Sequence, residues 1–206
     1  MITGQQLHAI MPLCDIKTWV SPLNTAMRTY QIDLTPQRMA AFLANVAHES
    51  SECARVVEIL NYSTPERICA VWPSRFKTIE SARVFVKNPE LLGNHVYGGR
   101  IGNDAPGDGY KFRGRGLFQL TGKANYLAAG KALSLPIIYH PQYVEQPNVA
   151  ALTAAWFWDK NGLNYLANQD TDASFEAIVR KINGGNNGMR ERRVYWELAK
   201  KVLGVE

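Results

Sequence analysis

The sequence has few cysteines and no long apolar run. Its 206 residues include only three cysteines, Cys14, Cys53 and Cys69, at no paired spacing. An odd, scattered set of this kind predicts reduced thiols rather than a disulfide framework. No stretch approaches the roughly 18 apolar residues that a membrane-spanning helix needs, and the N-terminus lacks the basic start and apolar stretch of a signal peptide. We therefore expect a protein that is made and folded in a cytoplasm.

Motifs for metal, nucleotide and serine-hydrolase chemistry are also missing. His48-Glu49 begins like the H-E-x-x-H signature of zinc proteases, but Glu52 stands where the second histidine should be. None of the four histidines pairs with another at metal-ligand spacing. There is no CxxC, no GxxxxGK[ST] phosphate loop and no GxSxG elbow. The sequence therefore predicts neither a metal nor any other cofactor.

The composition is that of a soluble globular protein of one domain. Hydrophobic residues make up 46% of the chain and charged residues 20%, which argues against extensive disorder. The length fits one domain, with room for two lobes around a cleft. A net charge of +5 fits nucleic acid, an anionic membrane or an anionic wall polymer equally well. Because the basic residues form no recognised nucleic-acid motif, we expect no nucleic-acid partner.

Helix signals recur along the chain. Thr35-Pro36 reads as an N-cap followed by proline at the first helical position, and it opens a helix over about 36–50. Met39, Phe42 and Val46 share one face of this helix. Similar starts precede helices near residues 65, 148 and 172, and residues 189–203 form a basic amphipathic pattern. The sequence predicts a mainly α-helical protein with little or no β-sheet.

One segment interrupts this helical pattern. Eight of the sixteen glycines lie between Gly93 and Gly116. Long irregular segments inside a compact helical domain are often functional, and glycine lets backbone atoms approach a ligand closely. Aromatic and basic side chains are interleaved with these glycines: Tyr97, Arg100, Tyr110, Lys111, Phe112, Arg113 and Arg115. The segment is predicted to bind a ligand; the alternative is a flexible surface loop.

Glu49 is a candidate general acid. It lies three residues beyond Val46 and so prolongs the apolar face of the predicted helix. Apolar surroundings disfavour an ionised carboxylate and keep its proton in place near neutral pH. The alternative is a carboxylate at a helix end that turns out to solvent, which periodicity alone favours.

A glycosidase needs a second carboxylate, and Glu52 and Glu58 are the nearby candidates. In inverting enzymes the two carboxyl groups lie about 6.5–9.5 Å apart. Nine residues of unbroken helix would place Glu49 and Glu58 about 13.5 Å apart along the axis. Glu58 can therefore act only if the helix ends near Ser50-Ser51 and the chain folds back.

Several motifs together resemble one enzyme family. They are HES at 48–50, Glu58 before NYS at 61–63, GNDAPGDGYKFRGRGLFQLTGKANY at 102–126, INGG at 182–185 and ERR at 191–193. In this order they resemble family 19 chitinases, and most closely the branch used as phage endolysins. The chain departs from the family pattern in having SEC after HES, where glycine and an aromatic residue are common. This departure leaves Glu52 as a substitute base. The chain also lacks the cysteines for the disulfides of plant members.

The resemblance implies a lysozyme-like superfamily fold with a deep substrate cleft and an inverting mechanism. The catalytic domain would span residues 1–206, without a separate cell-wall-binding domain. Glu49 matches the general acid, Glu58 the general base, and Thr121 the residue that holds the attacking water. Five further residues match sugar-binding or supporting positions: Tyr110, Gln119, Asn125, Asn183 and Arg192.

Several of these residues also have structural explanations. Thr121 precedes a helical stretch and could be its N-cap, and Asn183 before two glycines could shape a turn. Arg113 and Arg115 flank Gly114, where a guanidinium near Glu58 would favour a charged base; the alternative is a structural ion pair. These alternatives stay open at the level of the sequence.

We expect a monomeric endolysin that cuts peptidoglycan glycan strands between N-acetylmuramic acid and N-acetylglucosamine and lyses its bacterial host. Without a signal peptide, it would leave the host cytoplasm for the periplasm and wall through a separate pore. The alternatives are a chitinase, a lytic transglycosylase and a non-catalytic wall-binding protein. Residues 180–201 carry seven basic and two acidic side chains, so the last helix could contact anionic membrane or lipopolysaccharide, or simply be a solvated face.

Overall fold

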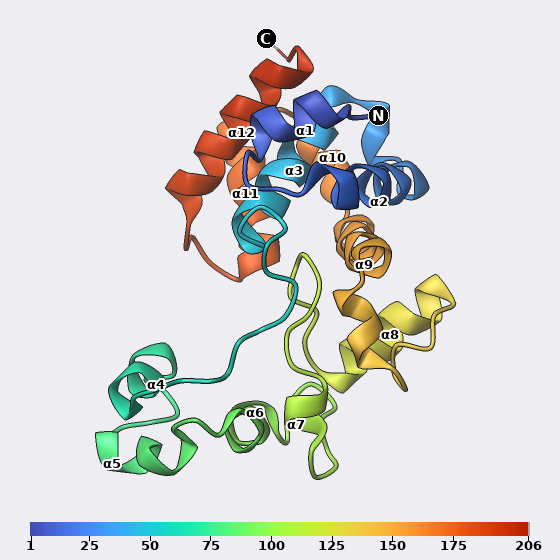
Figure 1. Ribbon diagram of the computed structural model, residues 1–206. Coiled ribbons are helices and arrows are strands. Elements are labelled where there is room, and N and C mark those ends of the chain that lie inside the picture. Colours follow the sequence, from blue (N-terminus) through green and yellow to red (C-terminus); the bar gives the residue numbers. More distant parts are fainter. Residues whose placement is uncertain (206) are drawn as a thin grey trace. The chain divides into compact units, whose positions relative to one another are not determined.

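The computed structural model describes residues 1–205, and within that range the chain forms helices and no β-strand (Figure 1). The predicted mainly helical class is confirmed. The α-helices are α1 (Gly4–Ile10), α2 (Ile16–Thr29), α3 (Pro36–Glu49), α4 (Pro65–Val71), α5 (Ile79–Ala82), α6 (Pro89–Tyr97), α7 (Asp108–Lys111), α8 (Lys123–Leu133), α9 (Pro147–Lys160), α10 (Leu163–Asn168), α11 (Asp172–Asn183) and α12 (Met189–Leu203). Three 3-10 helices complete the set: η1 (Ile32–Leu34), η2 (Arg83–Phe85) and η3 (Pro141–Glu145).

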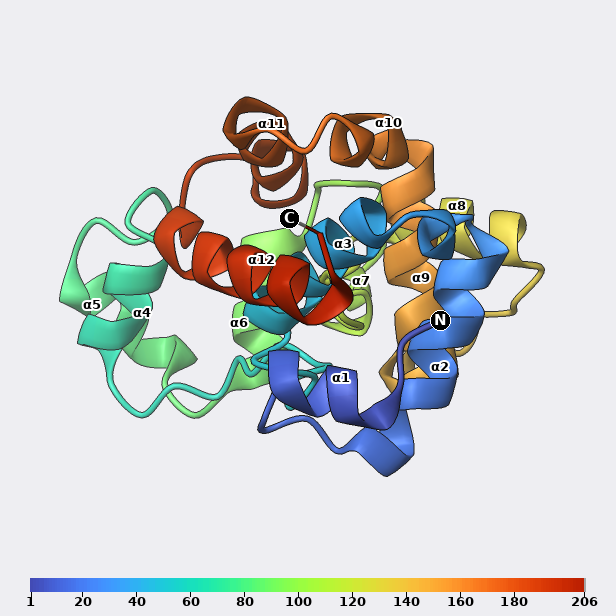
Figure 2. The ribbon, with the colours of Figure 1, turned by 90° about the horizontal axis from the view of Figure 1, so that it is seen from above.

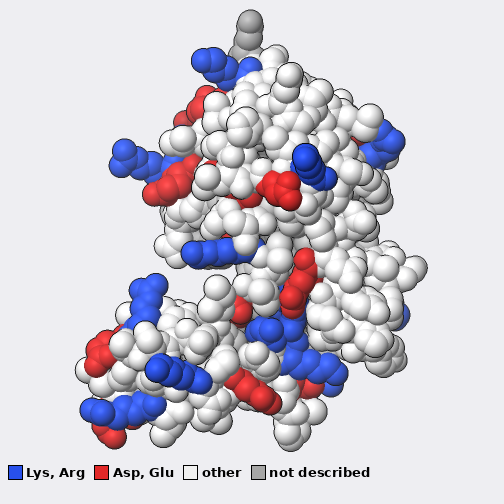
Figure 3. Space-filling view, viewed as in Figure 1, with Lys and Arg blue, Asp and Glu red and all other residues white. Residues whose placement is uncertain are grey.

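The chain divides into two compact units. Unit 1 comprises Met1–Val56, Arg115–Gln119 and the described residues from Gln142 onward. Unit 2 comprises Val57–Gly114 and Leu120–Pro141. Among residues 1–205, no helix combines the length and the apolar character needed to cross a bilayer. Basic and acidic side chains are interspersed over the face shown in Figure 3.

Helix α3 is the centre of unit 1. Nine of its residues, from Met39 to Ala47, are buried, and it packs along α12, beside which it lies in both ribbon views (Figure 1, Figure 2). Phe42 meets the edges of Phe118 and Trp158 at ring-centre distances of 5.6 and 5.4 Å, a geometry that adds to the effect of burial alone. Helix α2 packs against α9 in the same unit. The packing of α3 on α12 and the ring contacts of Phe42 place α3 in the core of unit 1.

The sequence signals at the start of α3 act as expected. The Thr35 hydroxyl accepts a hydrogen bond from the backbone N–H of Arg38 at 3.2 Å, and Pro36 occupies the first helical position. At the other end, the Ser50 hydroxyl donates to the carbonyl of Val46 at 2.6 Å and accepts from the N–H of Cys53 at 2.8 Å. The helix therefore ends at Glu49. A role of Glu58 as the base requires such an end, because an unbroken helix would hold the two carboxyl groups too far apart.

The turn after α3 is strained. Ser51, Glu52 and Cys53 have φ angles of 49°, 57° and 67°, so three consecutive residues other than glycine adopt the left-handed conformation. Each costs on the order of 1–2 kcal/mol. Hydrogen bonds from the N–H of Glu52 to Ala47 (2.7 Å) and from the N–H of Arg55 to Ser50 (2.8 Å) hold this conformation.

Unit 2 has its own small core and contains most of the glycine-rich segment. Seven buried apolar side chains, spread along the chain from Leu60 to Val96, form an apolar cluster of their own. Part of the segment 93–116 is helical, because the end of α6 and the whole of α7 lie in it. The buried Asn103 side chain ties this segment together: it donates to the carbonyl of Tyr97 at 3.0 Å and accepts from the N–H of Lys123 at 2.8 Å. A Cβ on Gly109 would lie 2.6 Å from the carbonyl oxygen of Gly93, so the glycine permits this close approach of α7 to α6.

Candidate active site

Glu49 is anchored by a buried arginine of unit 1. It is the last residue of α3, and its side chain is 18% exposed. Arg192 of α12, only 1% exposed, donates one Nη to Glu49 Oε1 and the other to Asn45 Oδ1, the latter at 2.8 Å. The Glu49 carboxyl therefore does not lie among apolar groups alone. It accepts a charge-assisted hydrogen bond from Arg192.

A substrate-binding role for Arg192 is not supported, because its guanidinium is enclosed by protein. Arg192 instead positions the Glu49 carboxyl. The sequence placed both residues in recognisable motifs but gave no sign of their contact, because 143 residues separate them.

His48 lies against the start of α12. A Cβ on Gly188, which has a φ of +70°, would lie 2.2 Å from His48 Nε2. A glycine at this position therefore lets the N-terminal end of α12 approach α3. Burial lowers the pKa of His48 from its ordinary value of 6.5, and the charge of Arg192 acts in the same direction, while Glu49 and Glu191 oppose it.

This lowered pKa predicts a loss of stability at acid pH. Below about pH 6.5 the unfolded chain binds a proton at His48 more readily than the folded protein does. The free energy of unfolding should therefore fall as the pH decreases, by at most about 1.4 kcal/mol per pH unit for one proton. Urea unfolding at about pH 7.5 and about pH 5 measures this effect. The His48→Gln variant should show a weaker dependence, and an equal one would contradict the assignment.

Glu52 is held by structural contacts in unit 1. Its side chain is buried. Oε2 accepts a hydrogen bond from the N–H of Leu13 at 2.6 Å, and Oε1 accepts one from the Tyr195 hydroxyl at 2.7 Å. Both oxygens thus bind protein donors that tie the turn after α3 to the N-terminal segment and to α12. We therefore set Glu52 aside as the alternative base.

Glu58 lies in unit 2 in a half-buried position. The Tyr97 hydroxyl donates to Oε1 at 2.7 Å, and the N–H of Gly114 donates to Oε2 at 3.2 Å. The N–H of Glu58 also donates to the carbonyl of Gly114 at 2.9 Å. These three bonds fix both the backbone and the carboxyl of Glu58 to the glycine-rich segment.

Tyr97 is a positioning residue that sequence reasoning missed. It was visible only as one aromatic residue among the glycines. Burial raises its pKa above the ordinary value of 10.0, and the nearby charge of Glu58 adds to the shift. The phenol therefore remains protonated at neutral pH and continues to donate its hydrogen bond to Glu58.

The Tyr97→Phe variant should lose activity through kcat. Removing one hydrogen bond to a charged group costs about 1.5–3 kcal/mol, which corresponds to a loss of roughly 10- to 100-fold in kcat, with KM almost unchanged. Tyr62→Phe is the matched control, because Tyr62 packs on the same unit 2 core and makes an edge contact with Trp72. Steady-state kinetics on solubilised substrate measure both variants. A fall in kcat of similar size in both would contradict a specific role for Tyr97.

The remaining unit 2 candidates lie around α7 and α8. The N-cap of α8 is Gly122, so the N-cap explanation for Thr121 is wrong. Asn125 Nδ2 donates to the carbonyl of Thr121 at 2.8 Å, which brings these two candidates together. Tyr110 in α7 is stacked under Arg113, whose guanidinium carbon lies 4.2 Å from the ring centre.

The remaining unit 1 candidates make local contacts. Gln119 has a left-handed φ of 50° and donates through Nε2 to the carbonyl of Gly116 at 3.1 Å; such a backbone outlier is a common feature of functional positions. Asn183 ends α11 and donates to the carbonyl of Asn187 at 3.3 Å, so it does shape the turn before α12. The sequence left two roles open for the arginines beside Gly114, support of a charged Glu58 or a structural ion pair. Buried Arg115 forms an ion pair with Glu145 at 2.7 Å.

The predicted site residues are thus divided between the units. Unit 1 holds Glu49, Gln119, Asn183 and Arg192, and unit 2 holds Glu58, Tyr110, Thr121 and Asn125. Direct contacts join Glu49 to Arg192 and Asn125 to Thr121. In the described residues, no group of three or more His, Cys, Asp or Glu is arranged to hold a metal ion.

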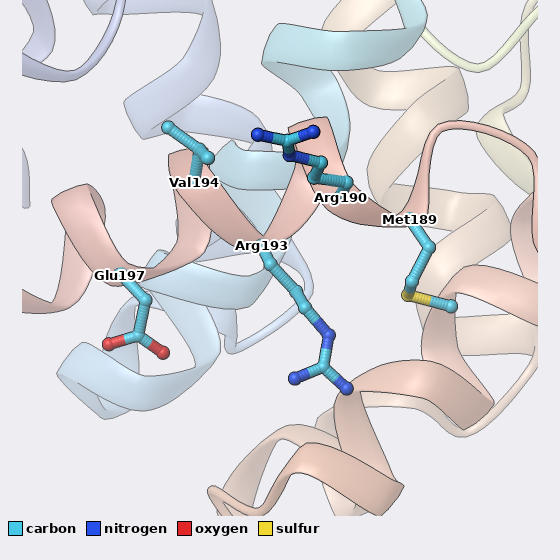
Figure 4. Close-up of a pocket in the computed structure, with 5 residues that line it drawn as sticks. All are labelled: Met189, Arg190, Arg193, Val194 and Glu197. Atoms are coloured by element: carbon cyan, nitrogen blue, oxygen red, sulfur yellow. The ribbon is translucent and has the colours of Figure 1, made fainter.

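An open hollow on α12, whose lining includes neither Glu49 nor Glu58, lacks a pair of carboxylates. It is an open depression of about 660 Å³ lined by Met189, Arg190, Arg193, Val194 and Glu197 (Figure 4). Arg193 forms ion pairs with Asp172 at 2.9 Å and Glu176 at 2.6 Å. The hollow holds a single carboxylate, so it offers no acid–base pair.

Comparisons with known proteins agree on one group of enzymes. The family model described as chitinase class I matches residues 84–185. A "Glycosyl hydrolase family 19 domain-containing protein" of Haemophilus influenzae is 39% identical over 158 residues, which cover 75% of this chain and 74% of that protein. An endochitinase of Arabidopsis thaliana is 42% identical over 105 residues, but these cover 47% of this chain and only 35% of the plant protein. A crystal structure of a bacterial family 19 chitinase superposes with a TM-score of 0.67 at 25% identity, covering 100% of this chain and 96% of that one.

Proposed function

Because the chain belongs to glycoside hydrolase family 19, we propose that it is an endolysin that hydrolyses β-1,4 bonds between N-acetylmuramic acid and N-acetylglucosamine in peptidoglycan. The chain is a chitinase-like glycoside hydrolase with the helical, lysozyme-like fold of bacterial family 19 chitinases. The choice of peptidoglycan, the stereochemistry and the residue roles are the proposed part.

In this proposal Glu49 is the general acid. Arg192 binds its Oε1, so Oε2 carries the proton and transfers it to the glycosidic oxygen as the bond from C1 to that oxygen breaks. The contact with Arg192 fixes the direction of the carboxyl, and orientation of a reacting group is itself a large part of catalysis.

Glu58 is the proposed general base. Tyr97 and Gly114 hold its carboxylate, which removes a proton from water while the water oxygen forms the new bond to C1 on the opposite face of the sugar. Thr121 supplies a hydroxyl that orients this water, and Asn125, bonded to the Thr121 carbonyl, supports its position. The product therefore has inverted configuration at C1.

The observation that favours peptidoglycan over chitin is the charge of the chain. The net charge is +5 with a pI of about 9.1, whereas chitin is uncharged and peptidoglycan carries the carboxylates of muramic acid peptides. An excess of basic side chains raises the local concentration of an anionic polymer. We further propose that the enzyme acts on the wall after passing from the host cytoplasm through a separate pore.

The second candidate function is chitin hydrolysis, which the likeness to plant endochitinases favours. Two assays with the same enzyme preparation separate the candidates: loss of turbidity of outer-membrane-permeabilised bacteria, and release of soluble sugar from colloidal chitin. We expect rapid loss of turbidity and little sugar release. Release from chitin without loss of turbidity would reverse the assignment.

The proposal does not include membrane contact by the last helix. Of the seven basic residues in 180–201, four form ion pairs within unit 1: Arg180, Arg192, Arg193 and Lys200. Their charge is therefore largely balanced inside the fold, and only part of the basic pattern in the sequence is available to an anionic surface.

A further inference from the structure

A buried carboxylate that takes no part in the proposed hydrolysis lies shortly after Glu49 in unit 1. Glu52 is 7% exposed, and both of its oxygens accept short hydrogen bonds from protein donors. Oε1 accepts from the hydroxyl of Tyr195 at 2.7 Å, and Oε2 accepts from the backbone N–H of Leu13 at 2.6 Å. We call these three residues the Glu52 clamp. Because a buried carboxylate is costly without hydrogen bonds, the clamp depends on both donors.

Two hydrogen bonds join the end of α3 and the following turn to α12 at the same spacing. Arg192 donates to Glu49, and Tyr195 donates to Glu52. In each pair 143 positions separate the two residues, so the second bond follows the first by three residues on both segments. Residues three apart on a helix lie on one face. Both bonds therefore set the same register of α12 on this part of the chain.

The Glu52 clamp also holds the strained turn that begins two residues after Glu49. Ser51, Glu52 and Cys53 are left-handed, a conformation that such residues keep only when the surrounding structure imposes it. The N–H of Glu52 donates to the carbonyl of Ala47 at 2.7 Å, while its carboxylate binds α12 and the segment between α1 and α2. Glu52 is thus fixed at both its backbone and its side chain, close to the end of α3 where Glu49 lies.

Arg192 has few other contacts that could hold its guanidinium in place. One Nη donates to Glu49 and the other to Asn45. Among residues 1–205, the Arg192 Nε has no hydrogen-bond partner. The direction of the guanidinium therefore depends on the position of α12, which the Glu52 clamp fixes three residues further along that helix.

Tyr195 keeps its donor proton near neutral pH. Burial raises the pKa of Tyr195 to about 12, and the hydrogen bond to Glu52 and the charge of that residue add to the shift. The phenol therefore stays protonated and continues to donate to Glu52 throughout the neutral range.

We propose that the Glu52 clamp keeps Arg192 bound to the Glu49 carboxyl, which makes Glu52 and Tyr195 positioning residues for the proton donor. Neither residue takes part in the proton transfer itself. The inference rests on the proposed role of Glu49 as general acid. When the clamp is broken, the turn and α12 are free to shift, and the Glu49 carboxyl loses its fixed direction. A small misplacement of a reacting group lowers the rate strongly.

Tyr195→Phe tests the clamp, because it removes the hydroxyl and keeps the ring. We expect kcat to fall roughly 10- to 100-fold with KM almost unchanged. The rates are measured well below the melting temperature, on the substrate that the turbidity and chitin assays select. Tyr30→Phe is the matched control, because Tyr30 is a partly buried tyrosine packed on the same core of unit 1; its kcat should stay within about twofold of the wild type.

Glu52→Gln breaks the clamp from the other side. Its amide nitrogen presents a donor where the carboxylate presents an acceptor. This variant should show the same fall in kcat, and it serves as the test if Tyr195→Phe does not fold. Combining it with Tyr195→Phe should add less than about twofold, because both changes break the same contact.

The same substitution in the Glu49→Gln background separates positioning from a general weakening of the fold. That background lacks the proton that the clamp is proposed to direct. Tyr195→Phe should therefore lower its residual rate by less than about twofold. A loss as large as the one in the wild-type background would overturn the proposal.

The contact between Arg192 and Glu49 has a readout that needs no activity. In protein labelled with ¹⁵N-arginine, NMR measures how fast the Arg192 Nε–H, in a side chain that is 1% exposed, exchanges with water. Exchange should be at least about tenfold faster in Tyr195→Phe than in the wild type or Tyr30→Phe. Unchanged exchange would overturn the proposal. Faster exchange together with wild-type activity of Glu49→Gln would support the clamp and reject Glu49 as the acid.

Discussion

Glu49→Gln is expected to lower kcat/KM on purified peptidoglycan by about 10²- to 10⁴-fold, the usual contribution of a general acid, while the fold remains intact. Glutamine has almost the same shape as glutamate, and its carbonyl oxygen can still accept the hydrogen bond from Arg192. It has no acidic proton for the leaving oxygen. The loss should therefore appear in kcat, with the circular dichroism spectrum and melting temperature close to those of the wild type.

Glu197→Gln is the matched control for this variant. Glu197 is an exposed residue of α12 in the same unit as Glu49. The change removes one negative charge in the same way, so activity should stay within about twofold because the residue has no part in the mechanism. Wild-type rates in both variants would remove Glu49 from the proposed role of acid.

Glu58→Ala should cause a loss of similar size for a different reason. The variant keeps the proton donor but lacks the group that takes a proton from water, so water attacks C1 slowly. Azide needs no such base, because it is already an anion. Added azide should therefore restore part of the turnover and give a glycosyl azide of inverted configuration.

The same azide experiment on Glu49→Gln is the control, because no anion can replace the proton lost there. We expect rescue in Glu58→Ala and none in Glu49→Gln. Full activity of Glu58→Ala without azide would show that another group, or no base at all, activates the water.

The extent of α3 could be predicted from the sequence because its signals are local. Thr35 and Pro36 mark its start, and the spacing of Met39, Phe42 and Val46 marks its buried face. The end of α3 near Glu49 was not predicted from local signals. It was stated only as what a role of Glu58 as the base would require. The strained turn that follows could not be predicted, because none of the residues at 51–53 is a glycine and their left-handed conformation depends on contacts with the rest of unit 1.

The surroundings of the two carboxylates could not be predicted for a related reason. Arg192 reaches Glu49 across 143 positions of the chain, and Tyr97 reaches Glu58 across 39. Helical periodicity indicates which face of α3 is buried but not which side chain from another helix lies against it. For this reason the sequence left Glu49 either against apolar groups or turned to solvent, and Arg192 was grouped with sugar-binding or supporting residues, whereas Arg192 donates a hydrogen bond directly to the Glu49 carboxyl.

The most direct test of the central claim, that a proton donor and a base act together on the anomeric carbon of an N-acetyl sugar, is proton NMR of the first products from soluble peptidoglycan fragments. The account predicts that the new reducing ends appear first as the α-anomer and equilibrate later, because water attacks the β-linked carbon from the opposite face. A β-anomer as first product, or a 1,6-anhydro end, would contradict it.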